Sequence, residues 1–176
     1  MIVRRLDAGL LPDAIGELAG LLTATVDAGA SVGFLAPLHR AEAAAWWTRC
    51  AGEVAGGRRA VWAAQADDRM LGTVSLVFPG MPNGRHRAEI TKLMVHPDAR
   101  GRGLGRRLLT VAEQAARAAG VGLLHLDTET GSPAEHLYRA AGWARAGTIP
   151  DYAASPDGTL RPTTLYYKHV GKAAAD

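Results

Sequence analysis

The sequence predicts a mixed α/β (α+β) domain in which helices cover one central sheet. Segments of strand length and helix length follow one another as strand, helix, helix, three strands, helix, strand, helix and closing strands. The strands predicted over 59–65 and 70–78 flank a short polar turn at 66–69, which is typical of an antiparallel hairpin. The helix predicted over 104–119 joins two strands as a crossover, so those strands are expected to be parallel.

Local signals set the boundaries in the first half. Pro12 suits the first turn of a helix, and Gly56 with Gly57 suits the end of one. Proline, glycine and asparagine cluster between the third strand and the next apolar run, which predicts a turn there. In chain order we expect a strand at 2–6, a helix at 11–28, a loop at 29–37, a helix at 39–55, strands at 59–65 and 70–78, and a turn at 79–87.

In the second half, the helix over 104–119 has an apolar stripe that suits packing on a sheet. Its members are Leu104, Leu108, Val111 and Ala115. Two glycines, Gly120 and Gly122, end that helix. Strands are predicted at 88–95 and 123–129, followed near the end of the chain by a long loop at 150–162 and a final strand at 163–169.

Length and composition predict one domain over residues 1–176. A chain of 176 residues with 48% apolar content can bury one sizeable core and is short for two. The net charge is only +3, without a basic block, so we expect no nucleic-acid partner. Cys50 is the single cysteine, and the chain has no run of about 18 apolar residues. We therefore expect a cytoplasmic protein with no membrane segment.

A glycine- and arginine-rich turn directly before the helix over 104–119 predicts a phosphate-binding site. Its residues are Arg100, Gly101, Arg102, Gly103, Leu104 and Gly105, and Arg106 and Arg107 follow. Glycines allow a phosphate to approach the backbone, and the first turn of a helix offers free N–H groups and a positive dipole end. The arginines add charge that suits a pyrophosphate. The predicted ligand is a nucleotide-like cofactor.

Two common nucleotide sites do not match this turn. A P-loop needs Gly-x-x-x-x-Gly-Lys-Ser/Thr, and no such sequence is present. A dinucleotide fingerprint needs Gly-x-Gly-x-x-Gly directly after a strand. Here the spacing is Gly-x-Gly-x-Gly, and four residues, His96 to Ala99, intervene. Nucleoside triphosphate hydrolysis and hydride transfer are therefore disfavoured.

The spacing Arg-x-x-Gly-x-Gly of Arg100, Gly103 and Gly105, downstream of Leu-Met-Val-His-Pro, resembles the acetyl-CoA loop of the GCN5-related N-acetyltransferases (GNAT). Residues 88–95, 123–129 and 133–143 resemble the fourth strand, the fifth strand and the fourth helix of that family. The segments 125–129, 151–158 and 165–168 look most like the tabtoxin-resistance acetyltransferase. The resemblance implies a mostly antiparallel sheet of about seven strands, with splayed strands 4 and 5, flanked by about four helices.

The resemblance also implies an enzyme that moves an acetyl group from acetyl-CoA to an amine. Cofactor and amine would enter the gap between the two splayed strands from opposite sides. A small-molecule amine is the expected acceptor, because the loop around Tyr152 to Arg161 suits a cover on that side. Members of the family are often dimers, so a homodimer is compatible with the resemblance. No metal is expected, since His125 and Asp127 are too few to hold one.

Strand alternation groups the residues that carry the predicted chemistry. On the fourth strand it puts Glu89, Thr91, Leu93 and Val95 on one face, opposite Ile90, Lys92 and Met94. On the fifth strand it groups His125, Asp127 and Glu129, opposite Leu124, Leu126 and Thr128. An ammonium group has no lone pair with which to attack a thioester, so acetyl transfer needs a base. Glu89 and Asp127 are the candidates, and the resemblance puts functional carboxylates at both positions.

The resemblance assigns the remaining roles. Tyr138 matches the general-acid tyrosine that protonates the departing thiolate. The N–H of Met94 or Val95 would polarise the thioester carbonyl, and the backbone of Leu93, Met94 and Val95 would pair with the pantetheine arm. The backbone amides from Gly101 to Arg106 would hold the pyrophosphate. Many relatives have an asparagine seven residues before the tyrosine, where this chain has Gly131 followed by Ser132.

Two other functions remain open at this point. One is acetylation of a protein N-terminus or of a lysine side chain, which needs an open groove for the peptide. The other is a basic module that binds nucleic acid or senses the cofactor without turnover. Only four of the twenty Lys and Arg residues cluster at the turn, which disfavours the module.

Overall fold

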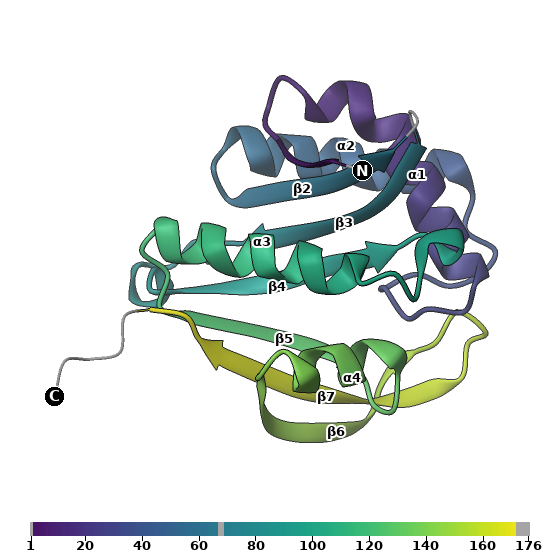
Figure 1. The fold of residues 1–176 in the computed structure, drawn as a ribbon. Helices are drawn as coiled ribbons and strands as arrows, with labels where there is room; N and C mark the ends of the chain where they lie inside the picture. The colour runs from purple at the N-terminus through teal and green to yellow at the C-terminus, as the bar shows by residue number, and fades with distance from the viewer. Residues whose placement is uncertain (1, 67–68, 172–176) are drawn as a thin grey trace, which may run out of the picture.

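The computed structural model describes residues 2–66 and 69–171 and shows one sheet with helices on both faces (Figure 1). The elements in chain order are β1 (Ile2–Leu6), α1 (Leu11–Asp27), α2 (Arg40–Ala55), β2 (Arg59–Ala66), β3 (Arg69–Val77), β4 (Arg87–Val95), α3 (Leu104–Ala118), β5 (Leu123–Glu129), α4 (Pro133–Ala140), β6 (Ala144–Ala154) and β7 (Leu160–His169). The seven strands lie in the order β1-β2-β3-β4-β5-β7-β6.

Every neighbouring pair of strands is antiparallel except β4 and β5, which are parallel. Helix α3 makes the crossover between those two strands, as the sequence predicts. The fold class is therefore confirmed. The hairpin of β2 and β3 is confirmed by its register, although the middle of the predicted turn, residues 67–68, lies outside the described part.

The two faces of the sheet carry separate apolar clusters. On β2, Val61 and Ala63 belong to the cluster under α1 and α2, whereas Ala60 and Trp62 belong to the cluster under α3 and α4. Successive strand residues point to opposite faces, which explains this division. The buried stripe of α3 begins with Leu104 and Leu108, as predicted, but then follows residues 109, 112 and 116, so that Val111 and Ala115 lie at its margin.

The loop expected over 150–162 is mostly strand. β6 runs to Ala154 and β7 begins at Leu160, so only residues 155–159 connect them. Pro150 disfavoured a strand in the sequence. It is tolerated because β6 is the edge strand and because its register with β7 is irregular between Ile149 and Ala153, where Asp151 has φ 50°.

A bulge in β4 breaks the predicted alternation along that strand. Thr73 pairs with Met94 but Ser75 pairs with Thr91, so β4 contains one more residue than β3 over this stretch. The extra residue is Lys92, whose φ is 51°. Beyond it the faces exchange, because Leu93 and Val95 pack on the α3 side and Met94 on the α1–α2 side. The prediction that Leu93 and Val95 share a face with Glu89 and Thr91 is therefore wrong.

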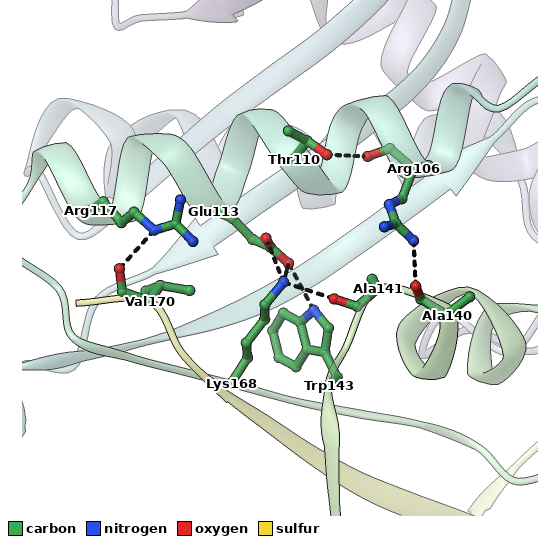
Figure 2. A network of polar contacts seen from close by, with 9 residues as sticks. All are labelled: Arg106, Thr110, Glu113, Arg117, Ala140, Ala141, Trp143, Lys168 and Val170. Carbon is green, nitrogen blue, oxygen red and sulfur yellow. Dashed lines mark hydrogen bonds and ion pairs between the residues drawn. The ribbon is translucent and has the colours of Figure 1, made fainter. Parts of the chain in front are cut away.

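The β4–β5 pairing is short, and α3 links the sheet on both sides of it. The two strands pair only at Arg87–Glu89 with Leu123–His125 and then diverge (Figure 1). Across this gap, Glu113 of α3 accepts three hydrogen bonds, two from Lys168 Nζ of β7 at 2.8 and 2.9 Å and one from Trp143 Nε1 at 2.9 Å (Figure 2). Arg106 and Arg117 donate to the carbonyls of Ala140 and Val170. These contacts join β7, α4 and Trp143 to α3.

Candidate active site between the diverging strands

The carboxyl-terminal end of β4 presents a free backbone edge to the gap. His96 N donates to Leu71 O, so in the antiparallel ladder the neighbouring residue Val95, opposite Gly72, points its N–H and C=O away from β3. Arg100 Nε donates to Val95 O from the gap side, at 3.2 Å. Met94 lies opposite Thr73 in the alternate position, so its N–H faces β3. Of the two predicted carbonyl-polarising donors, the structure therefore turns Val95 toward the gap.

The glycine turn forms an open cradle of N–H groups at the start of α3. Gly101 has φ 74° and Gly103 φ 75°, a conformation that favours glycine, and an added Cβ at either would meet no atom within 4 Å. The first α3 amide to find a backbone acceptor is that of Arg107, which donates to Gly103 O at 3.1 Å. In the described part, the N–H groups of residues 101–106 find no such acceptor. Open space and unpaired donors fit a diphosphate.

The predicted cofactor residues differ in what their side chains do. Leu104 is buried in the core, so only its backbone faces the turn. Gly105 allows α3 to approach α4, because a Cβ there would lie 3.2 Å from Leu137 Cδ2. The guanidinium of Arg106 is held by Ala140 O at 2.8 Å. Arg102 is exposed and makes no hydrogen bond to the residues that the structure describes, which leaves its guanidinium available to a ligand.

The ionisable residues of β5 share one face, as the sequence predicts. Leu124 and Leu126 are in the core on the α3 side, and Asp127 on the opposite face is exposed. Asp127 accepts a hydrogen bond from Thr163 Oγ1 at 3.1 Å. Glu89 of β4 pairs in register with His125, so it lies one alternation step from Asp127 on the same face. The structure thus brings the two predicted bases to one side of the gap.

Tyr138 lies on α4 with its ring in the core. It is 6% exposed, and its ring centroid is 5.9 Å from that of Trp143 and 6.4 Å from that of Tyr166. Burial raises the pKa of Tyr138 well above its usual value, and the nearby charge of Asp127 raises it further. The hydroxyl therefore keeps its proton at neutral pH, near a carboxylate of β5.

Ser132 has a structural role that the sequence left open. Its Oγ accepts a hydrogen bond from Glu135 N at 3.3 Å and so caps the N-terminus of α4. In return, Glu135 Oε2 accepts from Gly131 N at 2.6 Å. This is a variant of the capping box, in which Glu135 accepts from the residue before the N-cap, and it orients α4 and with it Tyr138.

Two loops meet on the other side of the gap. Lys92 Nζ donates to Val32 O, in the loop between α1 and α2, at 2.8 Å. In the same loop, Ala36 N donates to Pro156 O at 2.9 Å, which joins it to the β6–β7 loop. Ser155 Oγ of that second loop donates to Glu129 Oε2 at 2.7 Å. The β6–β7 loop expected to cover the acceptor side is thus shorter than predicted and is tied to both β5 and the α1–α2 loop.

The sequence reasoning missed a charged cluster behind these loops. Arg59, Lys92 and Trp46 lie together, since Arg59 Cζ is 5.5 Å and Lys92 Nζ 4.9 Å from the Trp46 ring centroid. The available signal was a lysine inside an otherwise apolar strand end, Thr-Lys-Leu-Met-Val. Strand alternation assigned it to the face opposite Glu89, and only the bulge brings it to the same side.

Other candidate features lie away from the gap. A cavity of about 560 Å³ lies between α4 and the β6–β7 hairpin and is lined by Thr130, Glu135, Arg139, Trp143, Arg145 and Tyr166. None of the predicted site residues lines it.

Over residues 2–66 and 69–171, no group of three or more His, Cys, Asp or Glu side chains is arranged to hold a metal ion. None of the helices in these ranges combines the length and the apolar character needed to cross a membrane.

Comparison with known proteins supports the fold and places the chain in a family. The family model described as "Acetyltransferase (GNAT) family" matches residues 16–143 of this chain. An uncharacterized N-acetyltransferase of Azospirillum brasilense, from the hisH-hisA intergenic region, is 34% identical over 117 residues, covering 64% of this chain and 68% of that protein. An IAA acetyltransferase of the same species is 41% identical over 69 residues, 39% of this chain and 45% of its own length.

Among solved structures, yncA from Salmonella typhimurium with its cofactor acetyl-CoA has the same fold. The TM-score is 0.78 at 19% identity, and the match covers 99% of this chain and 96% of that one. The family match extends over most of the chain, from α1 to the end of α4, and includes β4, the glycine turn and β5. The chain therefore belongs to the GNAT family and is an acetyltransferase.

Proposed function

We propose that this enzyme transfers the acetyl group of acetyl-CoA to a primary amine of a small molecule, by direct attack within a ternary complex. The observation that carries the proposal is the gap between β4 and β5. It has an open cradle of backbone N–H groups at Gly101 to Arg106 on one side and two carboxylates on the other. When bound, acetyl-CoA supplies the acetyl group as a thioester.

On the cofactor side, the amides of the glycine turn hold the diphosphate, with Arg100 and Arg102 adding charge. The free edge of β4 from Leu93 to Val95 holds the pantetheine arm, and Val95 N–H, which faces the gap, polarises the thioester carbonyl. Val95 is preferred over Met94 for this role because Met94 N–H faces β3.

On the acceptor side, Glu89 or Asp127 removes a proton from the ammonium group, directly or through water. The free amine attacks the carbonyl carbon, so that a C–N bond forms and the C–S bond breaks. Tyr138 gives its proton to the departing sulfur, the nitrogen of the new C–N bond loses its second proton to solvent, and Tyr138 is reprotonated from solvent. Burial raises the pKa of Tyr138, so the hydroxyl carries its proton at neutral pH until the thiolate forms.

Direct attack is preferred over a covalent acetyl-enzyme. Cys50 is the single thiol of the chain and is 2% exposed on α2. Burial raises the pKa of Cys50, which disfavours the thiolate that a nucleophile requires. A buried, protonated thiol is a poor acyl carrier.

A small acceptor is preferred over a peptide because the acceptor side is partly closed. The α1–α2 loop is tied to the β6–β7 loop through Ala36 and Pro156, and a peptide needs an open groove in this place. A toxin- or antibiotic-like amine, as implied by the resemblance to the tabtoxin-resistance enzyme, remains part of this proposal. The name of the IAA acetyltransferase relative also points to a small acceptor.

The proposal also covers the domain organisation, the cellular location and the partners of the protein. We propose a single domain over residues 1–176, in the cytoplasm, where the single Cys50 suits reducing conditions. Neither nucleic acid nor a membrane is an expected partner. A homodimer stays a prediction, to be checked by light scattering.

Thiol release from acetyl-CoA tests the proposal against a panel of small amines and of peptides with free N-termini or lysines. Release with small amines supports it, and release with peptides alone favours the protein acetyltransferase. Arg100→Ala with Arg102→Ala should raise the KM for acetyl-CoA about tenfold or more without a similar change for the amine. The exposed Arg58→Ala is the matched control. Absence of release together with salt-dependent DNA binding would reject the enzyme in favour of a binding module.

A further inference from the structure

Lys92 is a half-buried cation without a carboxylate partner. No acidic side chain of the described residues lies within ion-pair distance of its Nζ. Instead, Nζ donates to Val32 O at 2.8 Å and lies 4.9 Å from the ring centroid of Trp46 and 5.6 Å from that of Phe34. A carbonyl and two aromatic faces stabilise an ammonium group but do not neutralise it.

A second cation increases the positive charge at this place. Arg59 is 9% exposed, its Nε pairs with Glu53 Oε2 at 2.6 Å, and its Nη1 donates to Thr91 Oγ1 at 3.2 Å. Arg59 and Lys92 lie over the same Trp46 ring. Glu53 neutralises one of the two cations, so the cluster keeps one excess positive charge. Consistent with this, burial and then the charge of Arg59 lower the pKa of Lys92.

The excess charge lies beside the two predicted bases. The bulge turns Lys92 to the α1–α2 side of β4, the side of Glu89 and Asp127. Both carboxylates are near enough to raise the pKa of Lys92, against the effect of burial. An acceptor there meets negative charge, which suits its ammonium, and positive charge, which repels a second cationic group.

We propose that Lys92 makes the acceptor site selective for amines that also carry an anionic group, such as amino acids. The acceptor ammonium lies at Glu89 and Asp127, and its carboxylate lies at the Lys92 ammonium. Polycationic amines are disfavoured by the same charge. This inference rests on the proposed function and names its substrate class.

Matched acceptor pairs test it. Thiol release is measured for amino acids and for their carboxamides, which keep the amine and lose only the negative charge. The wild type is expected to favour the carboxylate about tenfold or more in kcat/KM. Lys92→Met keeps the length and packing without the charge, and its ratio is expected to fall to within about threefold of one. Lys92→Arg, which keeps the charge, is expected to retain a preference for the carboxylate.

A second measurement needs no variant. Carboxylic acids that lack the amine should inhibit the wild type competitively against the acceptor, and their carboxamides should inhibit at least about tenfold more weakly. Equal inhibition by acid and amide, or an equal acceptor ratio in the wild type and Lys92→Met, overturns the inference while acetyl transfer stands. Heat of acetyl-CoA binding to Lys92→Met establishes that it is folded. If no amine of any charge is acetylated by the wild type, the proposed function fails first and this inference fails with it.

Discussion

Tyr138 combines two properties that a structural tyrosine seldom has together. Its ring is buried against Trp143 and Tyr166, yet no hydrogen bond to its hydroxyl is found in the part of the chain that the structure describes. Among the described residues, the buried side-chain polar atoms without a partner are Trp47 Nε1 and Ser75 Oγ, so the Tyr138 hydroxyl keeps accessible surface and is free to donate to a ligand.

Tyr138→Phe is therefore expected to lower kcat about 100-fold, with the KM for acetyl-CoA within about twofold of wild type. Steady-state thiol release with both substrates varied measures these values. The free energy of unfolding should stay within about 0.5 kcal/mol of wild type, since the hydroxyl makes no hydrogen bond that the variant would remove. A wild-type kcat would leave Tyr138 with a packing role alone.

The charged Lys92 is expected to lower the free energy of unfolding. Because burial lowers the pKa of Lys92 in the folded state, the unfolded chain holds that proton more tightly. The charged lysine therefore opposes folding below its unfolded pKa, and stability rises as the pH increases through the interval between the folded and unfolded values. At pH 7, Lys92→Met should raise the free energy of unfolding by roughly 1 kcal/mol.

Denaturant titration checks this expectation, with Lys168→Met as the matched control. All three polar contacts of the Lys168 ammonium are made, to Glu113 and to Ala141 O, so its loss should destabilise. If Lys92→Met is destabilised as much as Lys168→Met, Lys92 serves mainly to hold the α1–α2 loop through Val32.

At the residue scale, the sequence predicted the features that depend only on the spacing of neighbouring residues. The glycines of the turn and the shared face of His125 and Asp127 follow from spacing and from an unbroken alternation. Lys92 was placed on the wrong face because one left-handed residue reverses the alternation, and a lysine gives no sign that its φ is positive. The catalytic roles themselves stay predictions.

At the element scale, α3 depends on Glu113 for its attachment to β7 and to Trp143, which lies between α4 and β6. The Glu113 side chain is buried with Lys168 and accepts from Trp143 Nε1 (Figure 2). Removing one partner of a buried pair leaves the other charge uncompensated. Glu113→Ala is thus expected to lower the free energy of unfolding by about 3 kcal/mol.

For a domain of this size the corresponding fall in Tm is roughly 6–12 °C. Differential scanning calorimetry measures it, and the exposed neighbour Gln114→Ala on the same helix is the control. A loss below about 1 kcal/mol would show that α3 is held by its apolar stripe rather than by this network.

The capping box of α4 makes a pH-dependent contribution. The Gly131 N–H hydrogen bond lowers the pKa of Glu135 from its usual value of 4.5, and the Tyr166 hydroxyl adds to the effect. A lowered carboxyl pKa stabilises the folded state above the unfolded pKa, and this stabilisation is lost as the pH falls through the folded value. Glu135→Gln should therefore be less stable than wild type at pH 7, by roughly 0.5 kcal/mol because solvent screens this charge.

The difference is expected to vanish when the urea midpoints are compared in strong acid, below both pKa values. Ser132→Ala, which removes the other half of the box, should cost a similar amount with much less pH dependence. A pH-independent Glu135→Gln effect would assign the contribution to packing of the side chain instead of its charge.

Helices and inner strands were predictable at this scale, whereas the edge of the sheet was not. The ends of α1 and α2 lie within one residue of the prediction. Residues 150–154 were predicted as loop because proline normally argues against a strand, and only the tertiary structure shows that β6 is the edge strand of the described sheet. Its partner β7 therefore also begins three residues before the predicted Thr163.

At the scale of the whole molecule, the gap is a consequence of weak pairing in the middle of the sheet. The strands on each side of the gap share one three-residue parallel contact. The other connections come from α3 and from the contact between the α1–α2 loop and the β6–β7 loop. A ligand that contacts β4, the glycine turn and α4 together should hold the two parts in place. Since such a ligand binds only the folded state, it should also stabilise the whole domain.

Coenzyme A at about 100 times its Kd is expected to stabilise the domain by about 2.7 kcal/mol. The Tm should then rise by roughly 5–11 °C. Thermal shift measurements over a range of concentrations test this, and the double variant of Arg100 and Arg102 should show a smaller shift at each concentration. An unchanged Tm at saturating coenzyme A would contradict the binding mode.

The bulge at Lys92 has a further consequence for genetic experiments on this protein. A point substitution of Lys92 changes the side chain but keeps the extra residue in β4. Point substitutions therefore cannot test the role of the bulge itself. Excision of codon 92 would test it, because the ladder would then be regular, with Leu93 opposite Val74 and with Leu93 and Val95 still on the α3 side. The deletion should therefore be compatible with folding, while it removes the Lys92 ammonium and its bond to Val32 O.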